Sequence, residues 1–302
     1  MEFYDICVIG AGPAGLTAAI YAGRYNLKTI VLGRVFGGTI SMAHEVGNWP
    51  GTEKISGADL ANNMINHVKS LGIEVLPKRV EQVTKVDDMF VIACEGFTVN
   101  AKKVILACGT KRRQLNVARE EEFTGNGLSY CNTCDGIYFK DRVVGVVGGG
   151  NAGCSSANEL AGVAKQVHII CPESSFIFAE PIRSKLIEDN SNIVKHFNAT
   201  VVELIGDDRL KGVKLSDGTV IPLAGLFVEI GAEPDKAFLT KIGLPINKNG
   251  YVVADSKMKT SIPGLFSAGS VNQGSFDQAI AASFQGALAA NTAYKELKGE
   301  NN

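Results

Sequence analysis

The sequence has no excess of charge of either sign. Lys and Arg number 30 against 31 Asp and Glu, so the formal net charge is -1, and no global field draws the protein to nucleic acid or anionic lipid. The sequence also lacks any apolar run near the about 18 residues needed to cross a bilayer. Residues 1–5 carry acidic side chains and lack the basic and then apolar order of a secretory signal. These absences exclude nucleic-acid and membrane partners and predict a cytoplasmic protein.

Cysteine does not follow the pattern of a disulfide scaffold. The 7 cysteines are an odd number and, apart from one close pair, are scattered in apolar contexts, as in a reducing compartment. With 302 residues, of which 45% are hydrophobic and 20% charged, the chain is predicted to form about two globular domains. Glycine is in excess, with 34 positions. Such an excess serves turns and close backbone approach to ligands, and phosphate-binding loops are the first candidates.

Two segments have the order strand, glycine-rich turn, helix, strand. In the first, residues 6–9 and 29–32 are predicted strands around the loop GAGPAG at 10–15. In the second, a strand at 143–147 precedes GGGNAG, with Gly148, Gly150 and Gly153, then a helix to about 161 and a strand at 167–170. One such loop could be a tight packing turn without a ligand. Two, each in the right context, predict an α/β protein with two Rossmann-like dinucleotide-binding domains.

Cys131 and Cys134 are close enough to form a disulfide across one turn, and Asp135 follows them. A zinc site would need more ligands, but there is no second Cys-x-x-Cys and no histidine between residues 111 and 154. Two inert core thiols are disfavoured by the polar residues 132, 133 and 135. Redox chemistry is therefore the preferred interpretation, with Asp135 available to move a proton during thiol–disulfide exchange.

With these motifs in place, the chain resembles the low-molecular-weight thioredoxin reductase family over nearly its whole length. The matching segments are residues 10–15, 37–38, 45–51, 107–110, 131–136, 148–153 and 262–269. The resemblance implies a homodimer in which an FAD-binding domain, residues 1–113 and 246–302, carries an inserted NAD(P)-binding-like domain, residues 114–245. It also implies that Cys134 faces the flavin, that Cys131 attacks the disulfide of thioredoxin or a similar protein, and that the domains rotate about linkers near Arg113 and Leu244.

The resemblance assigns the FAD contacts residue by residue. They are Gly10, Gly12, Pro13, Ala14, Gly15, Gly37, Gly38, Asn48, Gly109, Gly269, Ser270, Gln278 and Ala279. Ser270 departs from the family, which has an aspartate there, and keeps a hydrogen bond while losing the charge. Asp277 stands in place of the family's arginine. FAD remains the expected cofactor, and no metal is expected.

The second glycine loop departs from the family more strongly. Family members have a His-Arg-Arg cluster after the following strand, which holds the ribose 2′-phosphate of NADPH; here residues 171–175 contain no arginine. Glu173 instead stands about twenty residues after Gly153, where an acid favours an unphosphorylated ribose. NADPH is therefore disfavoured as electron donor. Ferredoxin, as in one branch of this family, is preferred, and NADH is the alternative. The apolar residues 176–178 either pack in the core or obstruct the site.

The predicted function is a thioredoxin reductase-like disulfide oxidoreductase that uses FAD. An alternative of another class is a flavin-binding redox sensor with little turnover. A relative of ferredoxin–NAD(P) reductase is disfavoured because that group lacks a Cys-x-x-Cys. Residues 120–122, all glutamate, are expected to be solvated in a linker. Of the histidines, His44 and His168 are expected to be structural, and His67 and His196 to lie at the surface.

Overall fold

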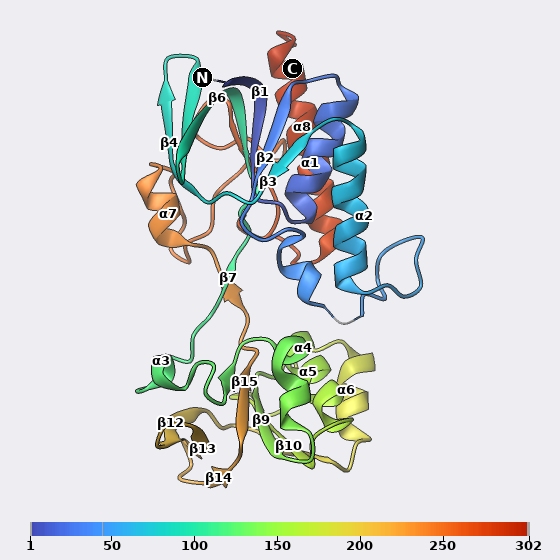
Figure 1. Cartoon of the computed structure of the whole chain (residues 1–302), viewed down its shortest axis with the longest axis vertical. Helices are drawn as coiled ribbons and strands as arrows, with labels where there is room; N and C mark the ends of the chain where they lie inside the picture. The colour runs from blue at the N-terminus through green and yellow to red at the C-terminus, as the bar shows by residue number, and fades with distance from the viewer. Residues whose placement is uncertain (1, 44, 301–302) are drawn as a thin grey trace. The chain divides into compact units, whose positions relative to one another are not determined.

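The computed structural model describes residues 2–43 and 45–300, and His44 lies outside these residues. The chain divides into two compact units (Figure 1). Unit 1 contains Met1–Lys111 and Glu233–Asn302, and unit 2 is the insert Arg112–Ala232. The predicted fold class is confirmed: each unit is built on a mainly parallel sheet with helices, and one is inserted into the other.

The second domain limit differs from the prediction. Unit 1 resumes at Glu233, whereas the sequence comparison with the family placed the limit near residue 246. The reason is the helix α7 (Lys236–Lys241) and the turn after it, because Leu239, Ile242 and Leu244 are buried in the core of unit 1. The segments at which the chain passes from one unit to the other pair as a short ribbon, β7 (Lys111–Arg112) with β16 (Ala232–Glu233).

Unit 1 contains a sheet of order β3-β2-β1-β6-β5-β4, with β17 also paired to β6. The strands are β1 (Glu2–Ile9), β2 (Thr29–Leu32), β3 (Glu74–Leu76), β4 (Val80–Val86), β5 (Met89–Cys94), β6 (Phe97–Leu106) and β17 (Leu265–Ser267). Strand β5 pairs antiparallel with the first part of β6 and, on its other side, antiparallel with β4, while β17 runs parallel to the last part of β6. The carboxyl ends of β1, β6 and β17 therefore meet at one edge.

Helices α1 (Pro13–Arg24), α2 (Gly57–Ser70) and α8 (Ala279–Leu297) cover one face of this sheet (Figure 1). Alternate residues of β1 face opposite sides, as expected for a strand buried on both faces. Ile6 and Val8 pack toward the helices, and Cys7 and Ile9 toward the β4–β5 side. A side chain at Gly286 of α8 would lie 2.0 Å from the Ala14 carbonyl oxygen, so glycine is what lets α8 approach α1. The short helix η1 (Gly38–Met42) precedes α2.

Unit 2 has a parallel sheet of order β11-β10-β9-β15-β8. Its strands are β8 (Leu128–Ser129), β9 (Val143–Val147), β10 (Gln166–Ile170), β11 (Ile193–His196) and β15 (Gly225–Val228). The helices α5 (Asn151–Ala161) and α6 (Pro181–Glu188) pack on one face, and an antiparallel meander on the other: β12 (Val201–Gly206), β13 (Leu210–Leu215) and β14 (Val220–Pro222). Three single-turn elements complete it, α3 (Glu120–Phe123), α4 (Asn132–Asp135) and η2 (Gly136–Phe139).

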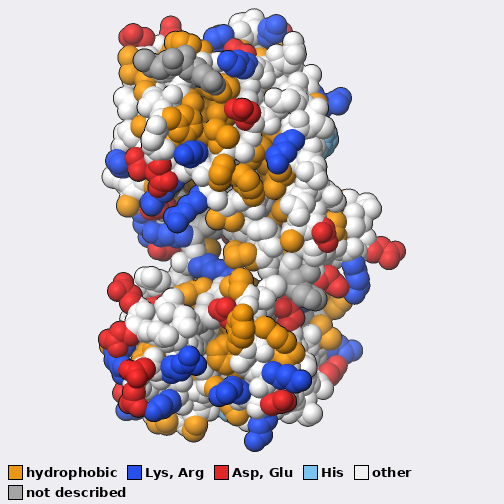
Figure 2. Space-filling model, in the orientation of Figure 1, with side chains coloured by type: hydrophobic (Ala, Val, Ile, Leu, Met, Phe, Trp, Pro, Cys, Tyr) orange, Lys and Arg blue, Asp and Glu red, His pale blue; other side chains and the backbone are white. Residues whose placement is uncertain are grey.

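Two further expectations concern histidine and charge. His67 is exposed as predicted, but His196 is half-buried, and its Nε2 lies 2.9 Å from Nδ1 of His168 on the neighbouring strand. The prediction of a surface position for His196 is wrong because β11 is the edge strand of a sheet, whose side chains still pack against those of β10. On the surface, cationic and anionic side chains are interspersed on the face in Figure 2, in keeping with the net charge of -1.

Candidate active site

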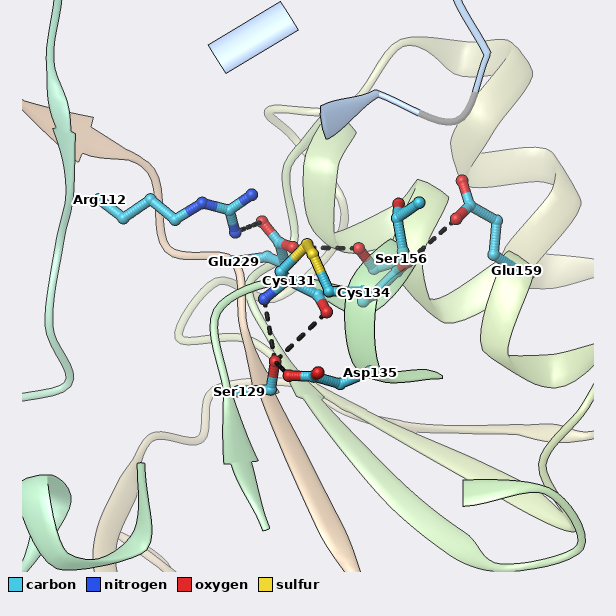
Figure 3. Close-up of a disulfide and its surroundings, with 10 residues drawn as sticks. Arg112, Ser129, Cys131, Cys134, Asp135, Ser156, Glu159 and Glu229 are labelled. Atoms are coloured by element: carbon cyan, nitrogen blue, oxygen red, sulfur yellow. Dashed lines mark hydrogen bonds and ion pairs between the residues drawn. A yellow bond between two sulfur atoms is a disulfide. The ribbon is translucent and has the colours of Figure 1, made fainter. Parts of the chain in front are cut away.

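The Cys-x-x-Cys pair forms a disulfide in unit 2. Cys131 and Cys134 are bonded to each other, with their Cα atoms 5.3 Å apart (Figure 3). Cys131 follows β8 with extended backbone and is the N-cap of α4, and Cys134 lies within that single turn. The other cysteines, 7, 94, 108, 154 and 171, are free. Burial raises the pKa of the thiols of Cys154 and Cys171 to about 11, so these sulfurs are poor nucleophiles.

Ser129 links the disulfide to the carboxylate of Asp135. The Cys131 N–H donates to Ser129 Oγ over 3.0 Å, and Ser129 Oγ lies 2.6 Å from Asp135 Oδ2, to which it donates (Figure 3). The Asp135 N–H also donates to the Cys131 carbonyl oxygen over 3.1 Å. The predicted proton carrier is thus held within the same small loop as the reactive sulfurs. Asn132 anchors the loop to α5, since its Nδ2 donates to Glu159 Oε2 over 3.0 Å.

Glu120 overturns one prediction. The residue is buried, and its carboxylate accepts the backbone N–H groups of Leu115 and Asn116, each over 2.8 Å, and the hydroxyl of Tyr130. It therefore belongs to the support of the redox loop, because Tyr130 directly precedes Cys131. The neighbours at 121 and 122 are exposed, as a solvated run requires. The sequence carried no signal that separates the first of three glutamates from the other two.

Glu229 is a polar residue that sequence analysis missed. It follows the buried strand β15, and its side chain is 10% exposed. Arg112 Nη1 lies 3.1 Å from Glu229 Oε2, and Ser156 Oγ donates to Glu229 Oε1 over 3.2 Å. Burial raises the pKa of Glu229, although Arg112 and Ser156 act in the opposite direction. An acid directly after an apolar strand was the signal that could have identified it.

The first glycine loop lies between β1 and α1 of unit 1. Gly10 has φ of 117°, and a side chain on it would lie 2.1 Å from the Ala107 carbonyl oxygen. A side chain on Gly15 would lie 1.8 Å from the Gly10 carbonyl oxygen. Gly12 is the N-cap of α1, no side chain caps this helix, and Pro13 opens it. The N-terminal N–H groups of α1 are thus left for a phosphate, which fits a dinucleotide.

The other residues assigned to FAD converge on the same edge of the sheet. The Gly37 N–H donates to the Ala11 carbonyl oxygen over 2.8 Å, which places residues 37 and 38 against the glycine loop. Asn48 Nδ2 donates to Gln278 Oε1 over 2.9 Å, although 230 positions separate them. Gly269 follows β17 and packs against Ala14. The remaining positions lie at the ends of secondary-structure elements: Gly109 follows β6, Ser270 follows β17, and Ala279 is the first residue of α8. These glycines and amides form a cradle that fits FAD.

The second glycine loop is built in the same way. A side chain on Gly153 would lie 1.9 Å from the Gly148 carbonyl oxygen, and one on Gly148 would lie 2.1 Å from that of Glu229. What faces the loop differs between the units. Gly12 faces glycines 37 and 38, whereas Gly150 faces Phe178, whose side chain is 67% exposed.

The segment facing this loop resolves the alternative left open for residues 176–178. Phe176 packs in the core of unit 2, but Ile177 and Phe178 are exposed. Glu180 donates its N–H to Asn151 Oδ1 over 2.7 Å, at the first residue of α5. Arg183, the nearest arginine after the loop, is paired with Glu180 over 3.2 Å and donates to Ser155.

Among the described residues, no group of three or more His, Cys, Asp or Glu side chains could hold a metal ion. The helices within residues 2–43 and 45–300 include none that is long and apolar enough to cross a membrane.

Comparison with known proteins identifies the family. The family profile described as "Pyridine nucleotide-disulphide oxidoreductase" matches residues 4–286. The thioredoxin reductase of Listeria innocua is 35% identical over 98% of this chain and 95% of that protein. The thioredoxin reductase structure from Lactococcus lactis has a TM-score of 0.94 at 32% identity, covering 98% of this chain and 99% of that one. A ferredoxin-flavin thioredoxin reductase from Clostridium acetobutylicum has a TM-score of 0.55 at 29% identity, covering 99% of each chain.

These matches cover almost the whole chain and include the insert that carries the disulfide. The chain therefore belongs to the pyridine nucleotide-disulphide oxidoreductase family, as a thioredoxin reductase-like flavoenzyme with FAD as its cofactor.

Proposed function

We propose that the protein reduces the disulfide of thioredoxin or a similar small dithiol protein in the cytoplasm. Bound FAD would supply the electrons, and Cys134 and then Cys131 would carry them to the substrate. FAD supplies the step that accepts electrons from a donor and delivers a pair of them to a disulfide. The observation that carries the proposal is the Cys131–Cys134 disulfide, held with Asp135 through Ser129 at the edge of a sheet.

The residues of the loop have distinct roles in this proposal. Cys131 attacks a substrate sulfur, and Cys134 then attacks Cys131 and releases the reduced substrate. Asp135 gives or takes a proton as each thiolate forms or disappears. Ser129 keeps Asp135 in place and fixes the backbone of Cys131.

Unit 1 holds FAD in this proposal. The N-terminal N–H groups of α1, reached past Gly12, bind the pyrophosphate, and Gln278 with Asn48 lies at the flavin end. Ser270 hydrogen-bonds the ribityl chain in place of the family's aspartate.

We propose ferredoxin, and not NADPH, as the electron donor. Residues 171–175, to which the family resemblance assigns the arginines of the 2′-phosphate site, contain no arginine and include Glu173, and the following Phe178 is exposed. Arg183 is engaged by Glu180 and Ser155. Arginine contacts to a phosphate contribute roughly 1.5–3 kcal/mol each, so the loss of two weakens NADPH binding by about two to four orders of magnitude.

Anaerobic mixing of the purified protein with NADPH, NADH or reduced ferredoxin tests the donor. Bleaching of the flavin absorbance by ferredoxin alone, followed by reduction of a thioredoxin disulfide, is the expected result. Bleaching by NADH would identify the alternative donor. Reduction by micromolar NADPH as fast as turnover would contradict the proposal, and reduction without turnover would indicate a sensor.

We also propose a homodimer formed through unit 1. An apolar groove of about 700 Å³ lies between α1, α2 and α8, lined by Tyr21, Trp49 and Phe284. The Ser283 hydroxyl also lines it, and this buried group has no hydrogen-bond partner among the described residues. Phe284 is 64% exposed in the single chain. Sedimentation of the wild type as a dimer and of Phe284→Asp as a monomer is expected. A monomeric wild type would refute the assignment.

A further inference from the structure

Glu229 and Cys131 lie just beyond the carboxyl ends of the neighbouring parallel strands β15 and β8. Phe227 of β15 is paired in register with Ser129 of β8. Glu229 and Cys131 each lie two residues further along, and Cys131 keeps an extended backbone with φ of -142° and ψ of 96°. Side chains two residues apart on a strand face the same side of the sheet, so both project toward the face covered by α5. Figure 3 draws Glu229 among the residues that surround the disulfide, with its carboxylate bound to Arg112 on one side and to Ser156 of α5 on the other.

Arg112 and Glu229 form an ion pair. The two side chains are 28% and 10% exposed, and their Nη1 and Oε2 atoms lie 3.1 Å apart. In this partly buried position a charge acts more strongly on its neighbours than in water. The other acids of the loop are already engaged, Asp135 with Ser129 and Glu159 with Asn132. Arg112 is thus a cation held next to the redox loop, and Glu229 is its counter-ion.

We propose that the Arg112–Glu229 ion pair balances the charge beside Cys131, so that after reduction Cys131 remains a neutral thiol until a disulfide substrate reaches it. The proposal rests on the roles assigned above to Cys131 and Cys134. An unpaired guanidinium would stabilise a thiolate on Cys131, and an unpaired carboxylate would oppose it. In the ion pair the two opposing effects on Cys131 largely cancel, because the fields of the guanidinium and the carboxylate have opposite signs.

The reduced enzyme transfers its electrons to the substrate in two thiol–disulfide exchanges. Cys131 loses its proton as its sulfur bonds to one sulfur of the substrate disulfide; the substrate S–S bond breaks, and the departing sulfur takes up a proton. The Cys134 thiolate then bonds to Cys131, and the second substrate sulfur leaves as a thiol by taking up the proton that Cys134 had passed to Asp135 when its thiolate formed. The enzyme dithiol is oxidised to a disulfide, and the substrate disulfide is reduced to two thiols.

Charge-changing variants in a Cys134→Ser background test the proposal, because Cys131 is then the single thiol of the motif. The measurement is the rate of alkylation of Cys131 by iodoacetamide against pH, followed by mass spectrometry of its peptide. Glu229→Gln leaves the guanidinium unpaired and is expected to lower the midpoint of the rate–pH curve by about one pH unit. At pH values below this midpoint, alkylation of Cys131 would then be about tenfold faster. Arg112→Gln is expected to raise it. Ser156→Ala, which keeps the ion pair, serves as the matched control.

The double variant separates charge from packing. Removing both charges with Arg112→Gln and Glu229→Gln should return the midpoint to within about 0.3 pH unit of the Cys134→Ser parent. An unchanged midpoint in Glu229→Gln would overturn the proposal, as would a double variant shifted as far as that single variant. Circular dichroism verifies folding, and if Glu229→Gln does not fold, the upward shift in Arg112→Gln decides the question.

Failure of the proposed thioredoxin reductase function can be told apart from failure of the charge-balance proposal. A protein with both cysteines that does not reduce thioredoxin with any donor would refute the function. The charge on Cys131 is read from the alkylation rate alone, which requires neither a donor nor a partner protein. The buried thiols of Cys154 and Cys171, whose pKa values are raised to about 11, react slowly at these pH values and are distinguished by their peptides.

Discussion

Replacing Gly12 by valine should separate cofactor binding from folding. Gly12 has φ of -86°, which any residue adopts, and a methyl group there would approach nothing closer than 3.8 Å. The fold of unit 1 therefore accepts the side chain, at a cost of about 1 kcal/mol for a poor N-cap residue. The same side chain would occupy the space in which a pyrophosphate approaches the N–H groups of α1. The expected product is a folded protein without flavin.

The size of the effect follows from the contacts that are lost. Displacing the pyrophosphate from α1 removes two hydrogen bonds to a charged group, each contributing roughly 1.5–3 kcal/mol. A total of about 3–6 kcal/mol corresponds to FAD binding weaker by about 10²- to 10⁴-fold. Gly12→Ala, with one methyl group, should give a smaller loss.

The assay compares flavin absorbance per polypeptide with the urea unfolding midpoint of the apoprotein. Gly15→Val is the matched control, because a side chain there would lie 1.8 Å from the Gly10 carbonyl oxygen and should prevent unit 1 from folding. A yellow, stoichiometrically loaded Gly12→Val protein would refute the assignment of this loop to FAD.

The remaining predictions concern the disulfide and the free energy of unfolding at low pH. Cys134→Ser should keep FAD but lose reduction of a protein disulfide, and Cys131→Ser should retain Cys134 as a stable thiolate; full activity of either variant in a thioredoxin assay would contradict the mechanism. Burial would raise the pKa of Glu296, but hydrogen bonds from Lys103 and Lys259 outweigh it and lower that pKa from 4.5. The carboxylate therefore stabilises unit 1 above about pH 4.5, and this stabilisation is lost as the pH falls through the lowered pKa. Urea unfolding should show Glu296→Gln less stable by about 1 kcal/mol at pH 7 and equal to the parent at low pH; a difference independent of pH would contradict this.

The sequence by itself determined the two glycine loops and the redox pair. Each is a contiguous motif whose geometry is local: Gly10 must adopt φ of 117°, and Cys131 and Cys134 must meet across one turn. Such features can be predicted from the sequence because the backbone constraint acts only on residues that are neighbours in the chain. The two-domain organisation followed from the repetition of one motif, and the resemblance to a known family added the insertion of one domain into the other.

Tertiary structure alone decided which distant side chains support these motifs. The contact of His196 with His168 depends on the register of β11 against β10, and the bond of Glu120 to Tyr130 and the pairing of Glu229 with Arg112 depend on how segments far apart in the sequence are brought together. The domain limit depended on whether Leu239 packs into one core or the other. Strand order and register come from the packing of the whole unit, and a charge or an apolar residue in the sequence does not specify its partner across the fold.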